Sequence, residues 1–565
     1  MTLNRSLASV NTPEAVIPPA IVQTPITPVG AVTDSKLKRL LHFLLRWETL
    51  LVIAILAIAG AAHGINMFHF PYFEDDEGTY LSQAWAVVNQ GRLAYYTYWY
   101  DHAPVGWFQI ALWTLLTGGS HTFGSPLYSG RVLMLIMQIG ATWMLYAIAR
   151  KISGNVLIAL VVALLFALSP YGIYYHRRVL LDNITTFTML LSILLLVSKR
   201  LSLKRVWLSA LAFSIAVLSK EITVFITPAL LYLVFSQTDK SHRWLATLGW
   251  AVLFASLVSL YPLMAIINNE LFPSGTWLGG NAPHVSLLQG VLYQASRGHD
   301  GGILNPNSEF WIMTRYWLQD DPVLVFFGTC AAILSVLLIK KYRVVGIMGL
   351  CSLCFWLYFL HGGEVIVFYL VPLLPLLALN LGLVLGILAE NMGNFLQRVF
   401  SLQAKFARVL QSAIFLLCLM AIVIPLYSPA FNLGYRSSDV GDRNNPFIDW
   451  NGTQADAQMM AIQWVEEHIP ANSRIVIDQS MWPDLHDSGH KYVHYYWKVE
   501  TDPAIRNAIF HNNWRNIDYV VTSPQMTIDA KESDMRLVQS IIDHSTIIVS
   551  FDTGGWPMRV RKVNK

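Results

Sequence analysis

Residues 73–80 read FEDDEGTY, and they follow an apolar run, TLLVIAILAIAGAAHGINM, at residues 49–67. A helix needs about 20 mostly apolar residues to span the hydrocarbon core of a membrane, so this run predicts a span. Positively charged residues mark the cytoplasmic end of a span. Four such residues precede the run: Lys36, Lys38, Arg39 and Arg46. The sequence therefore predicts that the acidic stretch 73–80 emerges on the outer side of the membrane.

The composition predicts an integral membrane protein. The 565 residues are 54% hydrophobic and 13% charged, and the mean hydropathy is +0.45. A net charge of +4 does not indicate a nucleic-acid partner, because the basic residues cluster in short loops instead of forming one face. We expect a polytopic α-helical fold with about eleven spans, near residues 49–67, 132–149, 156–175, 184–197, 206–218, 222–235, 245–267, 323–339, 345–360, 365–388 and 412–427.

The chain divides into three predicted regions. Residues 1–40 form a disordered cytoplasmic N-terminus, and residues 41–427 form the transmembrane domain. Residues 428–565 turn polar and read as a small outside α/β domain, with helices at 455–468 and 535–542 and strands at 474–478, 519–522 and 546–551. Two outside loops are longer than the rest, the first at 68–130 and the second at 268–322.

The first outside loop holds two features of its own. Asp76 is the predicted N-cap of a short helix at 78–89, which Gly91 ends and whose Leu81, Trp85 and Val88 lie in the membrane surface. The apolar segment 104–116 has about 13 residues, which is short for a span. We leave open whether it crosses, and prefer that it does not, because crossing would place two later basic clusters outside.

Acidic and basic residues collect at the outside ends of the predicted spans, which indicates a reaction centre. Charges at this depth are costly unless they are paired or functional. If a sugar is carried on a lipid phosphate, its leaving group is a stabilised anion that needs cations and no general acid. The acceptor hydroxyl needs a carboxylate base on the opposite face of the sugar. The residues concerned include Asp75, Asp76, Glu77, Asp101, His102, Arg131, Arg177, Arg178, Asp182 and Lys220.

Several motifs occur in an order and spacing that resemble the GT-C-type membrane glycosyltransferases, which use lipid-phosphate sugars. The resemblance is particularly to the protein O-mannosyltransferases and the bacterial transferases that add aminoarabinose to lipid A. The motifs are the acidic pair Asp76-Glu77, the sequence YDHAP at 100–104, Arg177 with LLD at 180–182, LSK at 218–220, and YLVPLLP at 369–375.

This resemblance implies a catalytic cavity on the extracytoplasmic side, an inverting transfer and a polyprenyl-phosphate sugar donor. By position, Asp76 is the catalytic carboxylate with Glu77 as its partner, and Asp75 is a rival for the base. The other implied substrate-binding residues are Asp101 and Asp182 in the cavity wall, Arg131, Arg177, Lys220 and Tyr369 near the phosphate, Arg178, and His102, which stands where many relatives carry lysine.

No cofactor is certain from the sequence, and the lipid-phosphate sugar is a co-substrate. A divalent metal ion stays open, with Asp76, Glu77, Asp101, His102 and His361 as its candidate ligands. We expect a multi-pass protein of the cell membrane and cell envelope whose partners are the bilayer, the donor, and an acceptor that is a protein, lipid or glycan. The alternative function is a transporter or flippase for a lipid-linked saccharide. It would place polar residues near the bilayer midplane.

Overall fold

The computed structural model describes residues 47–93, 100, 102–198, 201–281, 284–296, 301–360, 365–427 and 451–565. The chain divides into two units, Met1–Leu51 and Val52–Lys565. The second unit holds every element discussed below except the start of the first described helix.

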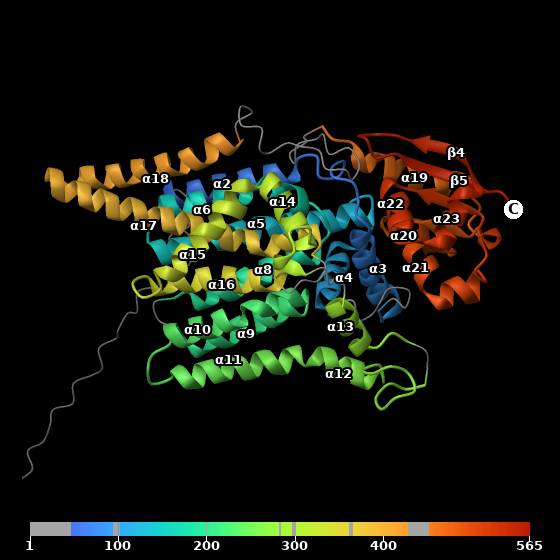
Figure 1. Cartoon of the computed structure of the whole chain (residues 1–565), viewed down its shortest axis with the longest axis horizontal. Coiled ribbons are helices and arrows are strands. Elements are labelled where there is room, and N and C mark those ends of the chain that lie inside the picture. The colour runs from blue at the N-terminus through green and yellow to red at the C-terminus, as the bar shows by residue number, and fades with distance from the viewer. Residues whose placement is uncertain are drawn as a thin grey trace, which may run out of the picture. The chain divides into compact units, whose positions relative to one another are not determined.

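Helices make up the membrane part of the chain (Figure 1). They are α2 (Trp47–Gly64), α3 (Asp75–Gln90), α4 (Val105–Thr117), α5 (Pro126–Ser153), α6 (Val156–Ala167), α7 (Pro170–His176), α8 (Leu181–Leu196), α9 (Leu203–Val217), η1 (Glu221–Ile226), α10 (Thr227–Gln237), α11 (Arg243–Val258), α12 (Leu260–Ile267), α13 (Leu287–Ser296), η2 (Gly302–Leu304), α14 (Glu309–Asp320), η3 (Val323–Gly328), α15 (Thr329–Leu337), α16 (Arg343–Phe359), η4 (Val367–Leu373), α17 (Leu374–Phe400) and α18 (Ala404–Tyr427).

The predicted count of eleven spans is not confirmed. Five helices in the described part of the chain are long and apolar enough to cross a membrane, and the number reaches seven if each of two bent pairs forms one span. The bends are 58° between α6 and α7 and 113° between α14 and the segment Val323–Leu337, which consists of η3 and α15. Four further apolar helices are shorter, with 10–17 residues. The predicted apolar segments thus form helices, but many of these helices are shorter than a span requires.

The helix that contains α17 is the centre of the membrane core. Residues 368–386 are all buried in the protein. Two glycines allow α6 to approach α17 closely. A Cβ on Gly382 would lie 2.3 Å from Val162, and one on Gly386 would lie 2.4 Å from Ile158. Small residues bring helix backbones together in this way in membrane proteins, where dispersion contacts drive packing.

The predicted apolar segment 104–116 corresponds to helix α4. Its 13 residues rise roughly 20 Å, short of the roughly 30 Å of a hydrocarbon core. One face of α4 is buried, including Trp107 and Ile110, while Phe108, Leu112, Leu115 and Leu116 are exposed. An apolar face of this kind, on a helix too short to span, is typical of a helix at the membrane surface.

The C-terminal region contains a five-stranded sheet with strand order β2-β1-β3-β5-β4. Strands β1, β2 and β3 are parallel, and β4 and β5 form an antiparallel hairpin whose β5 pairs with β3. The elements are α19 (Gln454–His468), β1 (Ile475–Ile477), η5 (Gln479–Met481), α20 (Trp482–Asp487), β2 (Val493–Tyr495), α21 (Tyr496–Thr501), η6 (Ala504–Ile509), η7 (Trp514–Asn516), β3 (Tyr519–Thr522), α22 (Pro524–Glu532), α23 (Arg536–Asp543), β4 (Ser545–Phe551) and β5 (Met558–Val563).

Both faces of this sheet are covered. Ile475 and Ile477 of β1 point to the core formed with α19 and α20, and Val476 between them points to the core formed with α21, α22 and α23. Alternation along a strand sends neighbouring side chains to opposite faces, so a three-residue strand serves both cores. The predicted α/β character of the C-terminal region is confirmed, although β2 and β5 were not predicted.

Candidate active site

The acidic stretch forms the beginning of α3. Glu74 is the N-cap, the helix runs from Asp75 to Gln90, and Gly91 ends it in the left-handed conformation with φ 65°. Three carboxylates in the first turn suit the positive end of the helix dipole. The predicted cap at Asp76 is therefore wrong by two residues, because the helix begins inside the acidic run. The predicted end at Gly91 is confirmed.

The face of α3 predicted to lie in the membrane surface packs against protein instead. Leu81 is 6% exposed and belongs to the membrane-domain core. Trp85 packs against the C-terminal core, and its Nε1 donates to Asp487 Oδ1 at 2.6 Å. That prediction is wrong because the C-terminal domain docks on α3, a contact that no local sequence pattern reveals.

Glu77 is fully buried and pairs with Arg131, which is also fully buried. Glu77 Oε1 accepts from Arg131 Nη2 at 2.9 Å and from the Glu74 N–H at 3.1 Å. Glu77 Oε2 accepts from Arg131 Nε at 3.2 Å and from the Val179 N–H at 2.8 Å. Each carboxylate oxygen thus receives two hydrogen bonds, which is the condition for a buried charge to be tolerated.

The guanidinium of Arg131 uses its remaining N–H groups on three backbone carbonyls. Nη1 donates to Met67 at 2.8 Å and to Pro71 at 3.0 Å, and Nη2 donates to Tyr72 at 3.3 Å. With the two bonds to Glu77, all five guanidinium donors are engaged. Arg131 therefore fixes the path of the chain between α2 and α3.

Asp75 points to the C-terminal domain. Its Oδ1 accepts from the Gln479 N–H at 3.0 Å, and its Oδ2 accepts from Tyr496 Oη at 2.9 Å. Tyr496 Oη also lies 2.5 Å from Asp529 Oδ2. A phenol has one proton, so one of these carboxyl groups has to share a proton with it. Burial, together with the charge of Asp478, raises the pKa of Asp75 well above its ordinary value, in agreement with this geometry.

Glu74 forms an ion pair with Arg178 across the same turn. The Arg178 guanidinium lies 4.4 Å from the ring centre of Tyr72 and 4.7 Å from that of Tyr174. Burial raises the pKa of Glu74, and Arg178 partly opposes that increase. Glu74 therefore helps to hold Arg178 between aromatic rings.

Asp76 faces a different set of residues from its three acidic neighbours. Successive helical residues are rotated by about 100°, so the four carboxylates diverge. Tyr80, one turn later, donates its hydroxyl to Asp76 Oδ2 at 3.0 Å. Asp76 is half-buried, and its charge acts on Lys220. Asp76 thus differs from Glu74 and Glu77, which pair with arginines, in that its charge acts on Lys220.

Lys220 follows α9 and is almost completely buried. Its Nζ donates to Asp182 Oδ2 at 3.1 Å and lies 4.7 Å from the ring centre of Tyr369 and 5.3 Å from that of Phe368. Burial alone lowers the pKa of Lys220, but the charges of Asp182 and Asp76 outweigh it, so that the pKa is raised. The ammonium group stays charged in a largely dry setting, where its field is strong.

Asp182 keeps one oxygen for another partner. Its side chain is fully buried at the start of α8, and Oδ1 has no hydrogen bond to any residue in the described part of the chain. An ionised buried oxygen without a partner is costly. A water molecule or a substrate hydroxyl beside Lys220 would satisfy it.

His102 and Glu221 close the site next to Lys220. His102 Nδ1 lies 3.0 Å from Glu221 Oε2, and the Ala103 N–H donates to Glu221 Oε1. The Val105 N–H donates to the Leu218 carbonyl at 3.1 Å, which fastens the start of α4 to the end of α9. The turn between α9 and η1 therefore carries both a cation and an acid into the site.

Arg177 donates hydrogen bonds to backbone carbonyls at the end of α2. Its Nη2 donates to the carbonyls of Ala62 at 3.0 Å and Ile65 at 2.9 Å, and Nη1 donates to Phe70 at 3.4 Å. The last carbonyls of a helix lack partners in the helix and carry partial negative charge, so a buried guanidinium satisfies them. Among the predicted cations, Arg131, Arg177 and Arg178 thus hold the protein together around the site, whereas Lys220 and His102 line it.

Two predicted residues, Asp101 and His361, lie outside the described residues. Among the residues that are described, no group of three or more His, Cys, Asp or Glu side chains is arranged to hold a metal ion. The candidate ligands Asp76 and Glu77 point apart, and Glu77 is engaged by Arg131.

Tyr80 and Phe368 contact Asp76 and Lys220, but the sequence alone predicts no role for either of them. Tyr80 could have been found from its spacing, because a residue four positions after Asp76 lies on the same helix face. Phe368 directly precedes Tyr369 in the motif near the phosphate, but nothing local marks it as a neighbour of Lys220.

Known proteins resemble this chain in sequence and in fold. Residues 101–266 match the family model described as dolichyl-phosphate-mannose-protein mannosyltransferase. The structure is similar to ArnT from Cupriavidus metallidurans bound to undecaprenyl phosphate, with a TM-score of 0.56 and 13% identity over 91% of this chain and 98% of ArnT. The fold is that of the GT-C-type glycosyltransferases.

A second GT-C-type relative by structure is the oligosaccharyltransferase of Archaeoglobus fulgidus in its apo form. The TM-score is 0.53, with 12% identity over 88% of this chain and 72% of the other chain. No curated protein matches the sequence. The predicted resemblance to GT-C-type glycosyltransferases is confirmed, and the family model covers His102, Arg131, Arg177, Asp182 and Lys220.

Proposed function

We propose that the chain is an inverting glycosyltransferase that moves a hexose or pentose from a polyprenyl-phosphate donor to an acceptor outside the cytoplasm. The observation that carries this proposal is the placement of one half-buried carboxylate, Asp76, within the field of one buried ammonium group, Lys220. A carboxylate that can accept a proton and a cation whose charge it influences suit a reaction in which a hydroxyl attacks and a phosphate leaves.

Asp76 is the base in this proposal. Glu77 and Asp75 begin the same helix, but Glu77 accepts four hydrogen bonds within the protein and Asp75 is bound to Gln479 and Tyr496. The Tyr80 hydroxyl orients Asp76, as a base needs to be oriented toward the acceptor proton. These contacts favour Asp76 over Asp75 as the base in this proposal.

Lys220 stabilises the phosphate as it leaves. A charged ammonium between Asp182 and the rings of Phe368 and Tyr369 is fixed in place, so little reorganisation is needed as charge develops. His102 supports the same phosphate from the start of α4. Arg131, Arg177 and Arg178 act as positioning residues, because their donors hold backbone carbonyls or acidic side chains.

A polyprenyl-phosphate donor is supported by the similarity to ArnT, whose structure contains undecaprenyl phosphate. We place the site at the outer membrane–water interface of the cell membrane, because the positive flank before residue 47 indicates a cytoplasmic N-terminus. A single passage through α2 then brings α3 and the C-terminal domain to the outside.

The test is incubation of the purified protein with a panel of labelled polyprenyl-phosphate sugars. Release of free polyprenyl phosphate identifies the donor even without an acceptor, through slow hydrolysis. The Lys220→Met variant should slow this release at least 10-fold, whereas Lys151→Met should not. Lys151 also ends a membrane helix, and it donates to the Leu194 carbonyl far along α5 from the site.

Because Lys220→Met leaves Asp182 buried without its cation, the double variant Lys220→Met/Asp182→Leu is made as well. It removes both charges and should fold better than the single variant while remaining as slow. The proposal is overturned if no donor in the panel is hydrolysed, or if a folded variant without Lys220 releases the lipid phosphate at the normal rate.

A further inference from the structure

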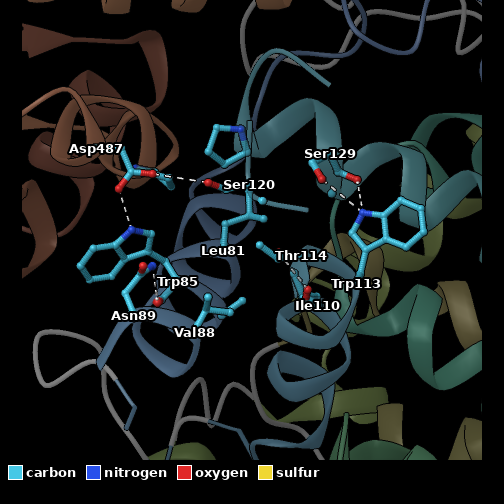
Figure 2. A pocket seen from close by; sticks show the side chains of 15 residues that line it. Leu81, Trp85, Val88, Asn89, Ile110, Trp113, Thr114, Ser120, Ser129 and Asp487 are labelled. Carbon is cyan, nitrogen blue, oxygen red and sulfur yellow. Dashed lines mark hydrogen bonds between the residues drawn. The ribbon is translucent and has the colours of Figure 1, made fainter. Parts of the chain in front are cut away.

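A separate cavity lies beside α3, on the side away from Asp76. Figure 2 shows it between α3, α4, the start of α5 and α20 of the C-terminal domain. Its volume is about 160 Å³. A dry cavity of about 150 Å³ holds one benzene molecule, so this space fits a single six-membered ring.

Two indole rings form walls of this cavity. Trp85 on α3 donates its Nε1 to Asp487 Oδ1 at 2.6 Å, and Trp113 on α4 donates its Nε1 to the Ser129 carbonyl at 3.0 Å. Because both N–H groups are satisfied within the protein, the rings offer their carbon surfaces to the cavity. Leu81 and Ile110 add aliphatic surface.

Polar groups also border the cavity, close to the two indole rings. Asp487 is partly exposed. Its Oδ1 accepts from Trp85, and among the described residues its Oδ2 has a long contact to Ser120 Oγ at 3.5 Å and lies 3.7 Å from His121 Nδ1. Contacts of this length are weak, so the carboxylate keeps acceptor capacity. The amide of Asn89 and the hydroxyl of Thr114 also border the space.

We propose that this cavity binds one sugar ring of a saccharide. A sugar ring presents carbon-bound hydrogens on its faces and hydroxyl groups around its edge, which matches indole walls with a carboxylate at the rim. An acyl chain of similar width does not suit the space, because a carboxylate and an amide in the wall would lose hydration without gaining a hydrogen bond.

The cavity does not coincide with the reaction centre. Leu81, Ala84 and Val88 lie four, seven and eleven positions after Glu77, so they follow the face of α3 that Glu77 occupies and not that of Asp76. Trp85 is nine residues beyond Asp76, or roughly 13 Å along the helix axis. A ring bound here is therefore a distal unit of a longer glycan or glycolipid acceptor, and the term acceptor rests on the proposed function.

The experiment measures saccharide binding by the full-length protein without donor. A printed array of defined oligosaccharides identifies binders, and calorimetry with the best of them gives the affinity. Thr114→Phe fills the cavity, and Asp487→Asn removes its charge while keeping an acceptor for Trp85. Each should weaken binding at least 10-fold. The control Leu115→Phe changes the next residue of α4, whose side chain is 63% exposed, and should bind normally.

The inference is overturned if no oligosaccharide binds the wild-type protein, or if a stably folded Thr114→Phe variant binds as well as the control. Loss of binding in Leu115→Phe to the same extent as in Thr114→Phe would also overturn it. Because the binding experiment contains no donor, a failure to bind saccharide does not contradict the proposed hydrolysis of the donor. Conversely, a protein that binds the saccharide but hydrolyses no donor refutes the proposed function alone.

Discussion

Replacing Glu77 with glutamine separates a positioning role from a catalytic one. Glutamine has nearly the same shape, but one of its two terminal groups is an NH₂ donor. In Glu77, each oxygen accepts one bond from Arg131 and one from a backbone N–H. Whichever way the amide turns, its NH₂ faces two donors, so two hydrogen bonds are lost and two donors are left unsatisfied.

The magnitude follows from the burial of the pair. Both side chains are fully buried, and Glu77→Gln leaves the charge of Arg131 uncompensated. Removing one partner of a buried ion pair costs about 3–5 kcal/mol. We expect Glu77→Gln to lower the free energy of unfolding by that amount, a large part of the roughly 5–15 kcal/mol that is typical of folded domains.

The assay is thermal unfolding of the purified variants in one detergent, together with a double-mutant cycle. Arg131→Met should destabilise the protein as much as Glu77→Gln. The two changes combined should cost less than their sum by about 0.5–3 kcal/mol, since they share one interaction. A Glu77→Gln variant with wild-type stability and no activity would refute this reasoning and indicate a direct catalytic role.

Three further predictions concern other parts of the site. Gly78→Ala should increase hydrogen exchange in η5, because its Cβ would lie 2.1 Å from the Gln479 carbonyl oxygen; unchanged exchange there would contradict the close docking of α3. Burial raises the pKa of Asp484 to about 7, so the folded state holds a proton that the unfolded state has released and stability should fall as pH rises from about 4 to about 7. Asp484→Asn should flatten that profile and add on the order of a few kcal/mol at pH 8, and a slope like that of the wild type would argue against it. His102→Lys should keep the pairing with Glu221 and lower the KM for the donor several-fold, whereas an unchanged KM would remove His102 from the phosphate site.

Much of the fold could be predicted because apolar runs, and the residues at which helices begin and end, are local signals in the sequence. The long run at 49–67 corresponds to α2, and Gly91 ends α3 as its conformational freedom allows. Strand β5 was missed although Met558 and Val560, two residues apart, are buried on one face of the sheet and Val563 is buried on the other. The spacing of these apolar residues can be seen in the sequence, but the charged residues between them obscure it as a strand pattern.

The site could be predicted in part. The sequence picked out Lys220 and Asp182, which form a buried ion pair from two different turns. The resemblance favoured Asp76 but left Asp75 as a rival, because the orientation of each carboxylate depends on where α3 begins and on its rotation. It also could not show that Asp75 is held by the C-terminal domain, since Gln479 and Tyr496 lie about 400 residues later.

The most direct test of the central claim compares Asp76→Asn with the wild-type protein under single-turnover conditions, with the identified donor and acceptor. Asp76 is half-buried and bonded to Tyr80, so the amide should fold normally and keep the wild-type unfolding temperature. Loss of a general base typically costs 10²–10⁴-fold in rate. We predict that Asp76→Asn loses transfer by at least about 10²-fold at unchanged stability, and near-normal transfer by this variant would contradict the assignment.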